Sequence, residues 1–458
     1  MASMDRPTLY AGANRLWGSA AGLVTAALVA TFFTPELQGY YFTFLSLMTL
    51  QTLVELGFGE LLQQFVSHEW AKTTSPGAEE RERAISRLQA LLRFSLRWYG
   101  GSALLLGAGL GIAGSLYFRV FSNDRGVAWE LPWWTAVAIT ALSVLLTPWF
   151  SFLEGANRVE RVHGVRLGQG VSSRVAGFLA IVSGFGLYTV AVTRIVSVAV
   201  GILGLGREFL AMRRGLVRSR SGQDPVSYRR ELWPLQWRFA LTWLSGYLLY
   251  SLFTPALFAF HGPEVAGRMG MTVAAASAIS SAAFAVMATK VPKLAMLAAE
   301  RDYPAMDSLF RRATASSVLV SGAGASIFLS ALALARALDL SIASRFLPIL
   351  DAALFLGALV LQQLRFAMGS YLRAHKAEPF APVAVVEALV AVPLLTLAAR
   401  ELGARGMILA FLVLTTATLL PAFHIFERCR RTWHPRTVSD PPGPDGAFLA
   451  EREARRFP

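Results

Sequence analysis

Apolar segments long enough to cross a lipid bilayer recur along almost the whole chain. The sequence has 458 residues, of which 54% are hydrophobic and only 16% are charged, whereas a soluble domain averages about 25% charged residues. A transmembrane helix needs roughly 20 apolar residues in succession. The chain therefore predicts an all-α, polytopic membrane protein, in which lipid replaces the charged surface that a soluble protein of this length requires.

Twelve such segments can be placed, with boundaries good to about three residues. We expect two six-helix lobes around a central cavity, namely an N-terminal lobe over 1–212 and a C-terminal lobe over 234–436. A cytoplasmic linker is predicted over 213–233, and a disordered cytoplasmic tail over 437–458, which is rich in proline, glycine and aspartate. The predicted spans are 9–33, 41–66, 90–116, 132–154, 167–186, 188–209, 235–260, 265–289, 313–335, 346–371, 380–399 and 405–426.

The distribution of basic residues orients these spans. If the N-terminus is cytoplasmic, 28 of the 43 lysines and arginines fall in cytoplasmic segments, and Arg15, Arg93 and Arg207 lie in the adjoining parts of the spans, which agrees with the positive-inside rule. Because the net charge of +14 lies between apolar segments, it indicates topology and argues against nucleic acid as a partner. We predict a multi-pass protein of the bacterial inner (cytoplasmic) membrane with both termini in the cytoplasm. The outer loops hold only Arg119, Arg125, Arg268, Arg336, Arg345, Arg400 and Arg405.

A short internal repeat supports the division into two halves. Pro35-Glu-Leu-Gln-Gly39 follows the first span and Pro263-Glu-Val-Ala-Gly267 follows the seventh, at an offset of 228 residues. Since each half has an even number of spans, the halves would share one orientation in the membrane. They would be related by an axis along the membrane normal, with a substrate path between them.

Ionisable residues occur within the spans, where a charge at the centre costs about 2.5 to 3.5 kcal/mol on insertion scales and needs a partner or a watery cavity. Arginines predominate, which favours an anionic substrate because guanidinium groups bind phosphate or carboxylate through paired hydrogen bonds. Arg194 and Arg238 lie near span ends, where they could instead extend to the headgroups. The residues that we assign to a substrate-binding cavity are Arg174, Arg97, Arg365 and Arg238.

Two acidic residues and one proline complete the set of candidates. Glu55 and Glu387 lie within spans and are predicted either to couple transport to an ion or to pair with arginines. Pro255 interrupts the seventh span and removes a helical hydrogen bond, so it is our candidate hinge, with a static kink as the alternative.

No catalytic constellation is visible in the sequence. The six histidines are dispersed without the spacing of metal ligands, and no glycine-rich phosphate loop follows a predicted strand. We therefore predict a transporter without cofactor or metal, and not an enzyme.

Strings at the start of both halves resemble those of bacterial polysaccharide flippases. These are the O-antigen-type transporters of the multidrug/oligosaccharidyl-lipid/polysaccharide exporter superfamily. The rest of the chain resembles them mainly through helix count. The strings are Thr34-Pro-Glu-Leu-Gln-Gly-Tyr-Tyr-Phe-Thr-Phe44, Glu55-Leu-Gly-Phe-Gly59, Ser67-His-Glu69, Trp237 to Tyr247, Ala266-Gly-Arg-Met-Gly-Met271 and Thr289-Lys-Val-Pro292.

The resemblance implies two lobes that alternate between cytoplasm-facing and outward-facing states around a cationic cavity. The implied cargo is an oligosaccharide linked through pyrophosphate to undecaprenyl lipid, relevant to lipopolysaccharide and polysaccharide biosynthesis. The implied partners are this lipid-linked glycan, the bilayer and the enzymes of polysaccharide assembly.

Two alternatives remain open at this point. A major-facilitator carrier of a small anionic solute also has twelve helices, although the loop over 67–87 lacks that family's short Gly, Asp and Arg-rich turn. A membrane-embedded glycan ligase or polymerase typically has a large outer loop, and the longest outer loop here, from Phe118 to Pro132, is short.

Overall fold

The computed structural model describes residues 6–52, 58–122, 126–218, 251–375 and 377–434, which are helical and contain no strand. The polytopic all-α prediction is confirmed. The helices are α1 (Arg6–Phe32), α2 (Pro35–Met48), α4 (Phe58–Lys72), α5 (Ala78–Phe121), α6 (Glu130–Val144), α7 (Thr147–Gly155), α8 (Val159–Val182), α9 (Tyr188–Arg218), α11 (Phe253–Ala288), α12 (Val291–Glu300), α13 (Tyr303–Ala337), η2 (Ser341–Arg345), α14 (Ile349–Ala374) and α15 (Ala381–Trp433).

In the described part of the chain, eight helical segments are long and apolar enough to cross a membrane. In two of these segments, those that contain α11 and α15, the helix is broken and the chain changes direction. Each of the two therefore corresponds to more than one predicted span. In α15, Glu387 and Thr418 are hydrogen-bonded at 3.2 Å, although 31 residues of straight helix would hold them about 46 Å apart. The chain turns at Gly403, whose φ of 67° only glycine adopts readily. Gly262, with φ 81°, breaks α11 in the same way.

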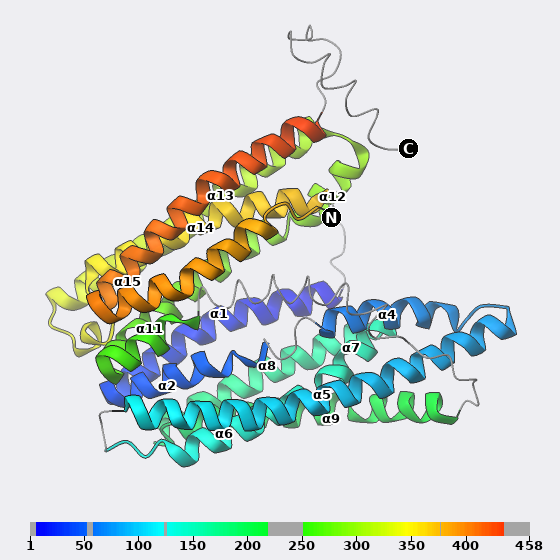
Figure 1. Ribbon diagram of the computed structural model, residues 1–458, viewed down its shortest axis with the longest axis horizontal. Coiled ribbons are helices and arrows are strands. Elements are labelled where there is room, and N and C mark those ends of the chain that lie inside the picture. The colour runs from blue at the N-terminus through cyan, green and yellow to red at the C-terminus, as the bar shows by residue number, and fades with distance from the viewer. Residues whose placement is uncertain (1–5, 53–57, 123–125, 219–250, 376, 435–458) are drawn as a thin grey trace, which may run out of the picture.

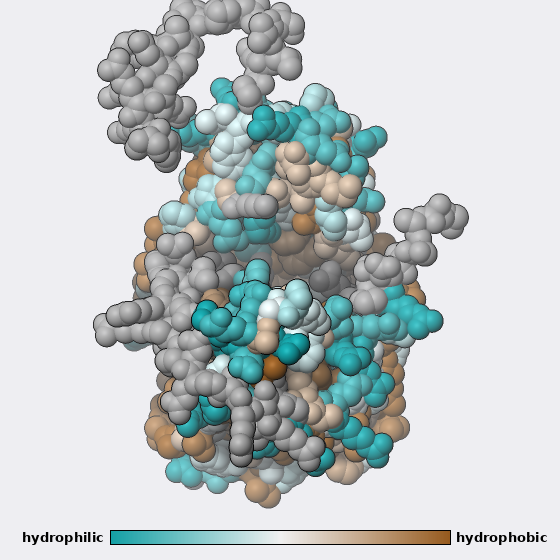
Figure 2. All heavy atoms as spheres, turned by 90° about the vertical axis from the view of Figure 1, so that its right-hand side faces the viewer, coloured by the Kyte–Doolittle hydropathy of each residue, from teal (hydrophilic) through white to brown (hydrophobic). Residues whose placement is uncertain are grey.

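The helices form two bundles (Figure 1). The first contains α1 to α9 and the second α11 to α15. The bundles meet at one end and diverge toward the other, which carries the start of α1 and the end of α15 (Figure 1). The meeting end is called the closed end below, and the diverging end is called the open end. Figure 2 looks onto the open end and shows polar residues around a hollow between the bundles.

The internal repeat forms the contact at the closed end. Gly39 of α2 packs directly on the backbone of Pro263 in α11, and a side chain at Gly267 would lie 3.2 Å from the carbonyl oxygen of Pro35. Each contact pairs the first residue of one repeat with the last residue of the other. A Cβ atom added at Gly267 would also lie 3.0 Å from the backbone nitrogen of its counterpart, Gly39. This reciprocal exchange is what a two-fold relation between the halves produces.

A second contact joins the bundles beside the repeat. Arg345 of η2 donates a hydrogen bond of 2.7 Å to the carbonyl oxygen of Phe33, and the Arg345 carbonyl accepts one of 3.1 Å from the Gln38 amide. Gln38 is only 1% exposed. The closed end is therefore held by polar contacts as well as by backbone packing.

Parts of the predicted domain organisation fall outside the described residues. The linker predicted over 213–233 is described only to residue 218, and none of the tail predicted over 437–458 is described.

Candidate functional site

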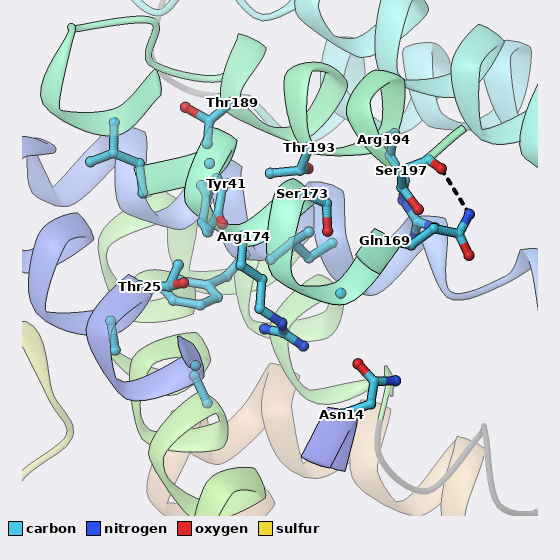
Figure 3. Close-up of a pocket in the computed structure, with 18 residues that line it drawn as sticks. Asn14, Thr25, Tyr41, Gln169, Ser173, Arg174, Thr189, Thr193, Arg194 and Ser197 are labelled. Atoms are coloured by element: carbon cyan, nitrogen blue, oxygen red, sulfur yellow. Dashed lines mark hydrogen bonds between the residues drawn. The ribbon is translucent and has the colours of Figure 1, made fainter. Parts of the chain in front are cut away.

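A cavity of about 480 Å³ opens inside the first bundle, between α1, α2, α8 and α9 (Figure 3). Small residues on α8 create it. Trp17 of α1 donates to the carbonyl oxygen of Gly170 at 3.0 Å, and Gln169 donates to the carbonyl oxygen of Ser197 in α9 at 2.7 Å. These contacts bring both neighbouring helices onto α8, because the glycines leave room for the approaching side chains.

The lining of this cavity is polar and cationic. It includes two arginines, Arg174 and Arg194, and no aspartate or glutamate among its described lining residues. The other polar groups are hydroxyls and carboxamides, which can donate hydrogen bonds to an anion. They belong to Asn14, Thr25, Tyr41, Gln169, Ser173, Thr189, Thr193 and Ser197.

Arg174 extends from α8 toward Asn14 of α1 (Figure 3). Its terminal nitrogen would lie 3.5 Å from a Cβ atom placed at Gly18, which is an ordinary van der Waals contact, so the guanidinium lies directly beside α1 at this level. Within the described residues, no carboxylate lies within ion-pairing distance of Arg174. Its charge is therefore available to a ligand.

The same arginine also lines a groove of about 680 Å³ between the two bundles. One wall is α1, with Asn14, Gly18, Ser19 and Gly22, and the opposite wall is α11. The α11 wall consists mainly of alanines and serines, at positions 274, 277, 278, 281, 285 and 288. Arg174 thus lines both the internal cavity and the groove between the bundles. Its role in binding a substrate stays a prediction.

Arg365 occupies a different environment from the one we expected. It forms an ion pair with Glu387 and donates to the Thr418 hydroxyl at 3.1 Å, all within the second bundle. Glu387 is only 1% exposed. Arg365 lines neither the cavity nor the groove. Of the two roles that the sequence left open for Glu387, the geometry matches the ion pair.

Arg97 also lies away from both spaces. It is exposed on α5 and shares a helix face with Leu104, seven residues on, whose side chain is 77% exposed. An exposed aliphatic face on a membrane helix is a lipid-facing one. Its position near the cytoplasmic end of the predicted span allows the guanidinium to extend toward the headgroups.

The remaining candidates have different outcomes. Glu55 and Arg238 lie outside the described residues. Pro255 is placed near the start of α11, and its carbonyl oxygen accepts a hydrogen bond of 2.5 Å from Tyr117 of α5. This bond links the two bundles. The hinge role of Pro255 stays a prediction.

Several residues that line the internal cavity were not among the candidates predicted from the sequence. Arg194 was expected to extend to the membrane surface, yet it lines the internal cavity with Arg174. Asn14 and Gln169 also lie within predicted spans. Because they are uncharged, they are a weaker sequence signal than the arginines. A usable signal was present, because Gln169 lies in a run of small and polar residues, from Gly168 to Arg174, at the start of a predicted span.

The chain was compared with known proteins. No protein-family model matches the sequence, and no curated protein matches it. Solved structures do resemble the fold. The inward-facing conformation of a multidrug resistance MATE family transporter of the MOP superfamily matches with a TM-score of 0.64 at 14% identity, covering 96% of this chain and 98% of that one.

Two further solved structures agree with this result. The lipid II flippase MurJ, in an inward closed conformation, has a TM-score of 0.60 at 13% identity and covers 93% of this chain and 90% of that one. The outward-facing conformation of a multidrug resistance MATE family transporter has a TM-score of 0.52 at 13% identity, with 95% and 98% covered. The chain therefore has the fold of MOP-superfamily transporters, which is the superfamily that its sequence resembles.

Proposed function

We propose that this protein flips a lipid-linked oligosaccharide, carried on undecaprenyl pyrophosphate, across the bacterial inner membrane. The observation that carries the proposal is the guanidinium of Arg174, which pairs with no carboxylate of the described residues and lies where the groove between the bundles meets a cationic cavity. Pyrophosphate is an anion with many acceptor oxygens, and an arginine fork can bind it with two parallel hydrogen bonds.

The fold supports transport between two bundles. A groove that opens at one end and is closed by the repeat contact at the other fits one state of an alternating-access cycle. We assign the open end to the cytoplasm, because the predicted cytoplasmic loops lie there. The higher TM-score with an inward-facing MATE transporter than with an outward-facing one agrees with this orientation.

The lining favours this cargo over two others. A cationic drug would be repelled by Arg174 and Arg194 in a space without described carboxylates. A small anionic solute would bind within the internal cavity alone and would make no contact with most of the groove. A glycan offers hydroxyl groups that the serines of the α11 wall can bind.

The primary test is the fate of the cargo in cells. A strain without the protein should accumulate lipid-linked glycan on the cytoplasmic leaflet, and the wild-type gene should relieve this accumulation. Normal surface polysaccharide without accumulation would refute the proposal.

Arg174 provides the matching test at the site. Arg174→Ala should reduce flipping by about ten- to one-hundredfold, since a hydrogen bond to a charged group contributes about 1.5 to 3 kcal/mol. Arg174→Lys should retain part of the activity, because it keeps the charge and loses the fork. Arg97→Ala removes the same charge from the lipid-facing side and serves as the matched control. Equal activity of Arg174→Ala and wild type at equal membrane levels would remove Arg174 from the site.

A further inference from the structure

An aromatic pair lines the groove, and anion binding does not account for it. Phe284 of α11 and Phe366 of α14 both contribute to the lining. Their ring centroids are 4.5 Å apart and their planes are inclined at 48°. Both side chains are only partly buried, although a neighbouring pair of phenylalanines in a packed core is normally covered. The rings therefore present apolar surface to the groove.

An arginine adjoins this pair on the open-end side. The guanidinium carbon of Arg373, two helical turns along α14, lies 5.9 Å from the centre of the Phe366 ring. Arg373 also donates to the Ser370 hydroxyl at 3.3 Å. The ring of Phe366 therefore lies between Phe284 and the guanidinium of Arg373, which also pairs with Glu378 at 4.0 Å.

The pair lines the same groove as Arg174. Ala274 lines the groove and the internal cavity together with Arg174. Phe284 is ten residues further along α11, which corresponds to about 15 Å of helix toward the open end. Ser277 and Ser281 line the groove between these two levels. The lining of the groove thus combines an arginine with serines, which are followed along α11 by an aromatic residue.

This order matches the chemistry of a glycan attached to pyrophosphate. Sugar rings carry hydroxyls at their edges and patches of C–H bonds on their faces. The hydroxyls can exchange hydrogen bonds with serines, and the weakly positive C–H groups are attracted to the negative face of an aromatic ring. A polyprenyl chain would need neither serines nor a positioned arginine, and a bare phosphate would not reach the rings.

We propose that Phe284 and Phe366 form a stacking platform for the sugars of the cargo, while Arg174 binds its pyrophosphate. The inference rests on the proposed function and adds an orientation to it, with the pyrophosphate deep in the groove and the sugars toward the open end.

Binding measurements on the full-length protein in lipid nanodiscs test this assignment. The two probes are undecaprenyl pyrophosphate and the lipid-linked glycan extracted from the strain that lacks the protein. The wild type should bind the glycan-bearing probe more tightly than the bare lipid. Phe284→Leu and Phe366→Leu keep apolar bulk and remove the flat ring. Each should weaken binding of the glycan-bearing probe by about tenfold, or about 1.4 kcal/mol, and leave the bare lipid unaffected.

Three further variants complete the design. Phe366→Tyr keeps the aromatic face and should retain the preference for the glycan. Arg174→Ala should weaken the binding of both probes to a similar extent, because both carry the pyrophosphate. Phe328→Leu is the matched control, since Phe328 of α13 also packs against a phenylalanine, Phe346, at 5.4 Å, but lines neither the cavity nor the groove.

These outcomes distinguish a failure of the stacking platform from a failure of the proposed flippase function. If the leucine variants weaken the binding of both probes equally, or of neither probe, the platform is wrong and the flippase proposal stands. If the wild type binds neither probe, the proposed function itself fails. Unchanged binding by Phe328→Leu together with selective loss in Phe284→Leu and Phe366→Leu supports the platform.

Discussion

The two buried arginines that the sequence ranked together, Arg174 and Arg365, have opposite roles in the structure. Arg174 faces the cavity and groove without a described carboxylate at ion-pairing distance, whereas Arg365 is neutralised by Glu387. Both lie within predicted spans, Arg174 close to the middle and Arg365 in the cytoplasmic half, and hydropathy does not distinguish a paired charge from an available one. Only the neighbouring helix determines whether such a charge is paired or available.

The ion pair leads to a prediction about stability. Arg365→Ala leaves Glu387 buried without its cation, and breaking a buried pair from one side costs about 3 to 5 kcal/mol. The variant should show a clearly lower melting temperature in detergent. The double variant Arg365→Gln with Glu387→Gln should recover most of the loss, because it leaves no buried charge.

An exposed pair supplies the control for that measurement. Arg400 and Glu401 lie 3.3 Å apart with side chains 67% and 60% exposed, so Arg400→Ala should change stability by less than about 1 kcal/mol. If Arg365→Ala melts at the wild-type temperature, the pair is not a structural element, and Arg365 returns to the list of cavity candidates.

At the scale of elements, the closest helix contact in the closed end joins α2 and α11. A side chain at Gly270 would overlap the side chain of Phe42, and these two positions are again 228 residues apart. Because only glycine permits this approach, any larger residue must push the helices apart.

Gly270→Val should therefore destabilise the closed end and shift the protein toward states in which that end is open. Thr272→Cys, in a Cys429→Ser background, reports the shift, because Thr272 is fully buried there. Its labelling by a membrane-impermeant thiol reagent should rise several-fold in the presence of Gly270→Val. Gly322→Val is the control, since a side chain at Gly322 meets nothing within 4 Å. Equal labelling of Thr272→Cys with and without Gly270→Val would contradict a role of this helix contact in keeping the closed end shut.

A pair of histidines connects α14 and α15 at the open end. The Nε2 atoms of His375 and His434 lie 3.4 Å apart, and the ring of His434 stacks on Tyr303 at 3.9 Å. Burial lowers the pKa of His375. Burial also lowers the pKa of His434, and the nearby His375 and Arg430 act in the same direction, while Asp307 opposes them. Both imidazoles are therefore held neutral in the fold.

The sign of the pH effect follows from these shifts. When the folded-state pKa of a histidine lies below its ordinary value, the unfolded chain binds the proton first, so stability is lost as the pH falls through about 6.5. Melting temperature should drop between about pH 7.5 and about pH 5.5. His375→Gln with His434→Gln should reduce that drop, whereas His68→Gln, at an exposed position, should not. An identical drop in both variants would assign the effect to other groups.

At the scale of the whole molecule, the two bundles define a rocking motion about the repeat contact. In a Cys429→Ser background, spin labels at Arg158→Cys and Glu300→Cys report the open end, because both positions are exposed on opposite bundles. Labels at Phe185→Cys and Leu338→Cys report the closed end, where these side chains are 53% and 61% exposed.

Binding of the lipid-linked glycan should populate a second state with opposite changes at the two ends. The distance at the open end should shorten by several ångströms, and the distance at the closed end should lengthen, as in a rigid-body rocking movement. If both distances shorten together, the bundles close by a different motion, and the repeat contact is not a pivot.

Sequence alone determined the polytopic all-α membrane class, and it predicted the individual spans and a relation between the halves. These follow from local physics, because bilayer thickness sets the length of an apolar span and a repeated turn leaves a repeated string. The reversals at Gly262 and Gly403 also lie where the predicted spans are interrupted. Only the tertiary structure decided which charges are available to a ligand. Pairing of Arg365 with Glu387, exposure of Arg97 to lipid, and the meeting of Arg174, Asn14 and Ala274 at one cavity depend on helix rotation and packing, which hydropathy does not encode.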